Sequence, residues 1–379
     1  FNSSRAFIVT VMALGALTVS THAQRGEAPA PKPKLPNPYK LEPEWPTLPA
    51  TMKGPNGKKW GEVIRVHVAP NGNIWVFNRC FYDKPNGDAT CVNRGEANPP
   101  ILEFNPAGRL LRSVGVGLFA HPHGFTVDKD GNLWTTDTND DEMILGMPAK
   151  NAQGVQMGQT VFKISPAGKI LMTIGKEGVT GTGPYLFDRP TGVSIAANGN
   201  IFVSDGHSGN KLKTGRIVKY SPDGKFIKEW GKMGPEPGNF RDPHDLYVGG
   251  SRGWVYVADR QNNRVQVFDQ DGNIITAWTQ FGQPSSVYVD KNDNLYVGAT
   301  YQNPARGSVT GPSDGPNDRA IVVGNAITGE LKYLIPDPGD LSKMTDTGTS
   351  ASGIAVDDQE NIYAADVGFN NLRKYVKTK

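Results

Sequence analysis

A short hairpin signature recurs six times along the chain and limits its possible folds more than any other feature. The clearest copy spans residues 120–137, where two alternating segments flank the turn at 129–132. Period-two alternation interrupted by a Gly, Asn or Asp turn is typical of a β-hairpin. The six copies of the turn and its aromatic residue lie at 72–75, 131–134, 199–202, 253–256, 293–296 and 360–363.

The spacing of these copies predicts one ring rather than several domains. Their aromatic residues are roughly 40 to 70 positions apart, which is the period of propeller arrays. Most copies continue into a third and a fourth strand, as in residues 161–175 and 217–231. Four short antiparallel strands repeated six times predict an all-β fold, a six-bladed β-propeller.

The sixth repeat indicates how the ring closes. Three strands are expected near 353–356, 362–365 and 372–376, and no fourth follows before residue 379. Folded proteins avoid exposed sheet edges. We therefore expect residues 39–59 to supply the outer strand of the last blade, with the propeller occupying residues 46–379.

The first 45 residues have a different character. Arg5 precedes an apolar run at 6–19, and the small-residue stretch at 21–23 predicts a cleavage site, so residues 1–23 are interpreted as a signal peptide. The run is too short for a membrane span. Residues 24–45 are rich in Pro, Lys and Glu and predict an extended linker. The protein is expected to be secreted or periplasmic.

Charge and cysteine content are consistent with export. The net charge of +3 indicates no nucleic-acid partner. Cys80 and Cys91 are the two cysteines of the chain and follow the second strand of the first blade. In an exported protein we predict that they form a disulfide, and two free thiols are the alternative.

Two histidines hold equivalent places ahead of innermost strands, where propeller loops meet at one mouth of the central channel. His123 belongs to the second blade and His244 to the fourth, and each follows a proline. Converging neutral imidazoles suit Zn²⁺, with His207 or His121 as the candidate third donor. The alternative is a polar cap in which each imidazole bonds to a loop carbonyl.

Two arginines follow second strands, where the chain returns to the same mouth. Arg79 does so in the first blade and Arg260 in the fourth. A guanidinium pair predicts a carboxylate-bearing small-molecule or peptide ligand, held by bidentate hydrogen bonds. Surface or inter-blade salt bridging is the alternative.

The motifs HPHGFTVDKDGNLWTTD, DPHDLYV and VADRQNNRVQVF resemble those of peptidyl-α-hydroxyglycine α-amidating lyases, within the NHL-repeat propellers. The resemblance covers about residues 60–379. It implies a six-bladed propeller that cleaves peptidyl-α-hydroxyglycine to a peptide amide and glyoxylate. It also implies zinc held by three histidines at the channel mouth and a structural calcium ion deeper in the channel.

Carried over by position, the resemblance implies that His123 and His244 are zinc ligands and that Arg79 and Arg260 bind substrate. His207 stands where the family has a tyrosine proposed as the base.

The resemblance also places the calcium carbonyls at Val66 and Phe125. Blade six reads Ala351-Ser352-Gly353 where the family has Pro-His-Asp, so a zinc ligand and a calcium ligand are missing there.

Three functions remain open on these residues. The first is a metal-dependent lyase with His207 as general base, because its unperturbed pKa is near neutrality. The second is a non-catalytic exported NHL propeller that binds a peptide, glycan or protein partner on its loop face. The third is a hydrolase similar to streptogramin lyases or lactonases.

Overall fold

The computed structural model describes most of the predicted propeller. The described residues are 35–49, 52, 61–80, 91–92, 98–138, 149–151, 153–207, 213–300, 319–338 and 351–378. The predicted signal peptide and the first part of the predicted linker lie outside these residues. No helix within the described ranges is long and apolar enough to cross a membrane.

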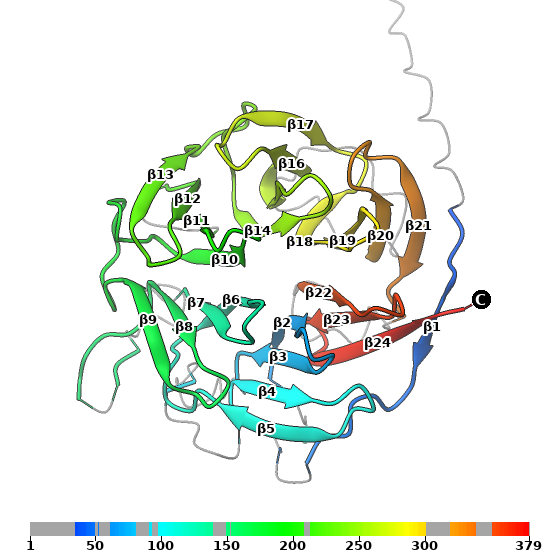
Figure 1. Cartoon of the computed structure of the whole chain (residues 1–379), viewed down its shortest axis with the longest axis horizontal. Coiled ribbons are helices and arrows are strands. Elements are labelled where there is room, and N and C mark those ends of the chain that lie inside the picture. The colour runs from blue at the N-terminus through cyan, green and yellow to red at the C-terminus, as the bar shows by residue number, and fades with distance from the viewer. Residues whose placement is uncertain are drawn as a thin grey trace, which may run out of the picture. The chain divides into compact units, whose positions relative to one another are not determined.

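The described residues form six four-stranded antiparallel sheets around one centre, which confirms the predicted six-bladed β-propeller (Figure 1). In five of the six sheets the strands pair in chain order, so each of these blades starts at the centre and ends at the rim.

The first three blades follow the chain from inside to outside. Blade one contains β2 (Val63–Val68), β3 (Ile74–Asn78), β4 (Ile101–Phe104) and β5 (Leu110–Val114). Blade two contains β6 (Pro122–Val127), β7 (Leu133–Asp137), β8 (Thr160–Ile164) and β9 (Ile170–Gly175). Blade three contains β10 (Pro190–Ile195), β11 (Ile201–Asp205), β12 (Arg216–Tyr220) and β13 (Phe226–Trp230).

The remaining blades repeat this order, apart from the last strand. Blade four contains β14 (Pro243–Gly249), β15 (Trp254–Asp259), the 3₁₀ turn η3 (Arg260–Asn262), β16 (Arg264–Phe268) and β17 (Ile274–Trp278). Blade five contains β18 (Gln283–Val289), β19 (Asn294–Thr300), β20 (Ala320–Asn325) and β21 (Leu331–Pro336). Blade six contains β22 (Gly353–Val356), β23 (Ile362–Asp366), β24 (Asn371–Lys377) and β1 (Tyr39–Glu42).

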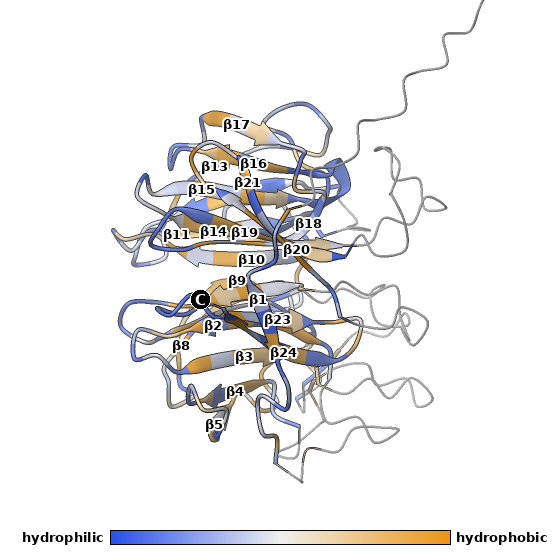
Figure 2. Ribbon diagram, turned by 90° about the vertical axis from the view of Figure 1, so that its right-hand side faces the viewer, coloured by the Kyte–Doolittle hydropathy of each residue, from blue (hydrophilic) through white to orange (hydrophobic). Residues whose placement is uncertain are grey.

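The aromatic residue of each hairpin signature fills the space between two blades. Trp75 packs in one buried cluster with Phe125 of the next blade, and Phe202 does the same with Leu246. The hydrophobic stretches lie in the strands and many connecting turns are hydrophilic (Figure 2). Burial of a large aromatic side chain stabilises the fold by roughly 1.5–3 kcal/mol, so the repeat supplies one such contact at each junction.

Four blades carry an aspartate three residues after the aromatic residue of the signature, and in three of them it holds the loop leading into the blade. Asp137 accepts the backbone N–H groups of Ala120 and His121. Asp205 accepts the N–H of Asp188 and forms an ion pair with Arg216 at 3.0 Å. Because these carboxylates bond to backbone and arginine within their own blade, they have a structural role.

The predicted disulfide is confirmed, because Cys80 and Cys91 are bonded to each other. The N–H of Cys91 also donates to the carbonyl of Ala120 at 3.2 Å. The bridge therefore ties the segment after β3 to the segment that leads into blade two. Such bonds persist in oxidising compartments.

The ring closes as predicted, with a strand from the N-terminal part of the chain. β1 pairs antiparallel with β24, Tyr39 lying opposite Lys377. This strand lies within residues 24–45, which the sequence assigns to a linker, so the propeller begins before residue 46. Composition indicated extended chain there. It could not show that the exposed edge of β24 would recruit that chain as a partner.

Removal of β1 should therefore weaken the whole ring. A chain beginning at residue 43 loses the β1–β24 ladder and the buried ring of Tyr39, and its unfolding free energy should fall by about 3 kcal/mol or more. A chain beginning at residue 35 keeps β1 and serves as the control. Urea unfolding followed by tryptophan fluorescence compares the two, and equal midpoints would contradict the closing role of β1.

His67 gives a pH-dependent test of the contact between blades one and two. Its Nδ1 lies 3.3 Å from Oγ1 of Thr126, and burial lowers the pKa of His67 from 6.5 to about 4. Between these values the unfolded chain binds a proton that the folded protein excludes. The folded protein should therefore lose up to about 1.4 kcal/mol per pH unit as the pH falls through this window.

His67→Gln cannot titrate and should lose less stability than the parent between pH 7 and pH 5. Urea unfolding at both pH values measures the difference. The same pH dependence in parent and variant would show that His67 is not held neutral by the fold.

Candidate metal centre

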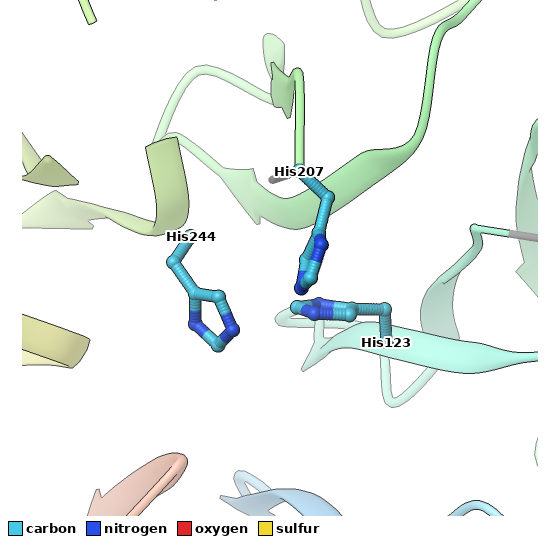
Figure 3. Close-up of side chains that lie close together, drawn as sticks. All are labelled: His123, His207 and His244. Carbon is cyan, nitrogen blue, oxygen red and sulfur yellow. The ribbon is translucent and has the colours of Figure 1, made fainter. Parts of the chain in front are cut away.

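Three histidines from three consecutive blades come together at the centre of the ring. His123 is on β6, His244 is on β14, and His207 follows β11. One ring nitrogen of each lies within 4.8 Å of the others, and the rings point toward one another (Figure 3). Their centroids are 4.8 to 5.3 Å apart. His121 is buried nearby but is not part of this group.

Hydrogen bonds to the neighbouring blade orient two of the rings. Nδ1 of His123 lies 2.7 Å from the carbonyl oxygen of Thr191, and Nδ1 of His244 lies 2.8 Å from that of Ser285. A carbonyl can only accept, so each Nδ1 carries the proton. Each Nε2 is then unprotonated and has a lone pair to offer a ligand.

The same two histidines are held in the neutral form. Burial is the main cause that lowers the pKa of each well below 6.5, and the His207 ring acts in the same direction on both. Nε2 of His123 is buried and has no hydrogen-bond partner among the described residues. In both residues Nδ1 bonds to a loop carbonyl, as the polar-cap interpretation expected. Nε2 still offers the neutral nitrogen donor that a Zn²⁺-type ion needs.

His207 reaches the group because the backbone at Gly206 adopts a conformation that favours glycine. Gly206 has φ +124°, and a Cβ there would lie 2.2 Å from the carbonyl oxygen of Thr214. The carbonyl of Arg189 accepts the N–H groups of both Gly206 and His207, at 3.2 and 3.1 Å. The loop is therefore tied to the start of blade three, and His207 extends beyond it toward the other imidazoles.

The two predicted arginines also return to the start of their own blades. The N–H of Arg79 donates to the carbonyl of Glu62, and that of Arg260 donates to Asp242. The side chain of Arg79 pairs with Glu62 at 3.0 Å and donates from Nε to the carbonyl of Pro122. That of Arg260 lies 3.8 Å from Asp242. Both salt bridges thus lie within a single blade, and only the Nε hydrogen bond of Arg79 crosses a blade junction.

Both arginines lie in the electrostatic surroundings of the histidines. Arg79 is among the groups that lower the pKa of His123, and Arg260 among those that lower the pKa of His244. Their side chains are 11% and 21% exposed. Cationic groups that are partly open to solvent beside the imidazoles favour an anionic ligand at this end of the ring.

A third arginine, which the sequence did not single out, lies deeper. Arg65 on β2 is 3% exposed and donates to the backbone carbonyls of Ser352 and His244. The signal in the sequence was its place in the innermost strand, where the equivalent positions of the other blades carry shorter side chains.

A calcium ion does not fit the residues around Val66 and Phe125. These lie on β2 and β6, directly after Arg65 and Gly124 in the chain. Gly353 offers no carboxylate from blade six, and Asp245 of blade four is 3.5 Å from the Arg65 guanidinium. Calcium requires hard oxygen ligands such as carboxylates. The Asp245 carboxylate is already beside the Arg65 cation.

Comparison with known proteins agrees with this architecture. Residues 240–268, in blade four, match the NHL repeat. The chain is 32% identical to peptidyl-glycine alpha-amidating monooxygenase A of Xenopus laevis, over 68% of this chain and 28% of the relative. It is 31% identical to a probable peptidyl-alpha-hydroxyglycine alpha-amidating lyase of Caenorhabditis elegans, over 56% of each. The chain thus spans about a quarter to a half of these relatives.

The fold also matches solved propellers. A gluconolactonase of Xanthomonas campestris superposes with a TM-score of 0.54, at 13% identity, covering 84% of this chain and 86% of the other. At that identity the match concerns the fold alone. Together with the repeat and the sequence relatives, it shows that the chain is a six-bladed β-propeller with an NHL repeat and is similar in sequence to amidating lyases.

Proposed function

We propose that this protein is an exported, metal-dependent lyase that cleaves a peptidyl-α-hydroxyglycine-like substrate to an amide and glyoxylate. The observation that carries the proposal is the convergence of His123, His207 and His244 within 4.8 Å of one another. Sequence similarity to amidating lyases supports the substrate class. The disulfide supports an oxidising compartment.

The three imidazoles would hold a divalent ion, most suitably Zn²⁺. Three neutral histidines with one open position are a donor set of catalytic zinc sites. The Nδ1 bonds of His123 and His244 to carbonyls resemble the second-shell bonds that orient such ligands. When bound, the ion supplies Lewis-acid polarisation of a substrate oxygen.

This geometry favours a ligand role for His207 over the general-base role expected from the sequence. Its ring centroid lies 5.0 Å from that of His123 and 5.3 Å from that of His244. An imidazole nitrogen that donates its lone pair to a metal cannot accept a proton at the same time. His207 therefore replaces the third histidine that blade six lacks at Ser352.

Arg79 and Arg260 would hold the substrate carboxylate. In the cleavage the hydroxyl group loses its proton, its oxygen forms the C=O bond of glyoxylate, and the C–N bond breaks. The amide nitrogen then takes up a proton. Guanidiniums from blades one and four, near the histidines, would place the carbinol carbon next to the imidazoles, because the carboxylate is its direct neighbour.

Metal binding gives the first test. The metal-free parent should bind one Zn²⁺ per chain, and His123→Ala and His207→Ala should each weaken binding by more than about 100-fold, beyond the 10–100-fold typical of second-shell changes. His121→Gln is the matched control and should bind like the parent. Competition titration with a chromogenic chelator measures the affinities. If His121→Gln loses zinc and His207→Ala keeps it, the assigned donor set is wrong.

Substrate cleavage gives the second test. The zinc-loaded parent should release glyoxylate from a peptidyl-α-hydroxyglycine, and Arg79→Met or Arg260→Met should raise KM about ten-fold or more through loss of a charged hydrogen bond. Arg252→Met, at an exposed turn, is the control. Glyoxylate is measured by a coupled assay. Zinc binding without glyoxylate release would favour a non-catalytic propeller that binds a partner on its loop face.

A further inference from the structure

Arg65 spans the centre of the ring with a buried guanidinium. It starts on β2 of blade one, and Nη1 donates to the carbonyls of Ile64 and of Ser352 in blade six. Nη2 donates at 2.8 Å to the carbonyl of His244 in blade four. Blades one and four face each other across the ring (Figure 1). The side chain must therefore cross the axis to make this bond.

The position of Arg65 in its strand carries no comparable side chain elsewhere in the ring. At the equivalent position of the innermost strand, the other blades have Gly124, Gly192, Asp245, Ser286 and Gly353. Gly353 is needed for the arrangement, because a Cβ there would lie 2.7 Å from Cα and 3.2 Å from Cδ of Arg65. A carboxylate-bearing residue at 353 and Arg65 could not share this space without a backbone shift.

We propose that the Arg65 guanidinium is the built-in axial cation of this propeller, occupying the centre of the ring in place of a structural divalent metal. A divalent ion at the ring centre would need the oxygens that surround Arg65. The carbonyls of Ser352 and His244 already accept its hydrogen bonds, and Asp245 is its ion-pair partner. These are oxygen ligands of the kind that calcium requires.

The charges around Arg65 agree with this role. Oδ1 of Asp245 lies 3.5 Å from Nη2, and Oδ2 accepts the N–H of Val287 in blade five. The carboxylate thereby extends the Arg65 network to a fourth blade. Arg79 and Arg260 are close enough to lower the pKa of Arg65, after burial, but a guanidinium stays charged in proteins. A second cation at this point would meet three arginines.

The same network makes Arg65 a positioning residue for His244. The carbonyl of His244 is held by Arg65 and its Nδ1 by Ser285, so both backbone and ring are fixed. This consequence rests on the proposed function, because it matters for a metal only if His244 is a ligand.

Calcium addition tests the axial role without reference to zinc. The Tm of the metal-free parent should not change when calcium is added. An increase in Tm with calcium would overturn the proposal, because the ring would then have a vacant structural cation site.

Variants of Arg65 test the positioning role. Arg65→Met should lower the Tm and weaken zinc binding about 10- to 100-fold. Arg65→Lys, which keeps the charge, should recover part of both. Arg216→Met is the matched control, because Arg216 is a buried arginine that bonds to Asp205 and loop carbonyls within blade three. It should lower the Tm and leave zinc affinity unchanged.

The Co²⁺ absorption spectrum adds a readout that stability alone does not alter. In Arg65→Met it should differ from the parent spectrum, and in Arg216→Met it should match. If the parent binds zinc and Arg65→Met shows the parent affinity and spectrum, the positioning role is overturned. If the parent binds no zinc, the proposed function fails, and the calcium result still decides the axial role. Should Arg65→Met not fold, Arg65→Lys replaces it in the comparison with Arg216→Met.

Discussion

At each of the six blade junctions, a hydrogen bond from one blade to a backbone carbonyl of its neighbour connects the blades around the centre of the ring. Hydrophobic packing between sheets resists separation but allows sliding, whereas a directed bond to a backbone carbonyl sets the relative height of two blades. Around the ring the bonds run from Arg79 to Pro122, His123 to Thr191, Thr191 to Pro243, His244 to Ser285, Ser286 to Ala351, and from Arg65 back to Ser352.

Two members of this set serve the candidate site at the same time. The Nδ1 atoms of His123 and His244 take part in the inter-blade bonds, and this leaves the Nε2 atoms deprotonated at the centre. The energetic reason is that a buried imidazole is costly to protonate, and a single carbonyl acceptor satisfies one nitrogen only. The inter-blade bond at Nδ1 therefore leaves Nε2 as an electron-pair donor. The geometry of the candidate site in turn depends on the blades closing into the correct ring.

Arg65 and His207 together account for how this chain differs from the motif that it resembles. Blade six contributes no histidine and no carboxylate at Ser352 and Gly353, and the space is used by the Arg65 side chain of the adjoining blade one. The third imidazole comes instead from the loop after β11. The ring thus keeps three histidines and a central cation, supplied by different residues.

The sequence by itself determined the repeat, and hence the number of blades, the closing strand and the disulfide. The number of blades follows from the local periodicity, and the closing strand from the unpaired edge of the last blade. The disulfide follows from the short separation of Cys80 and Cys91 along the chain. It also placed His123 and His244 in equivalent positions, since residues in register around a ring share a height. Only the tertiary structure decided that the closing strand within residues 39–59 is Tyr39–Glu42, that His207 rather than His121 joins the group, and that Arg65 crosses the axis. Those outcomes depend on where a loop turns at Gly206 and on which carbonyl a long side chain can reach. Both are set by contacts between residues far apart in sequence, which no local pattern records.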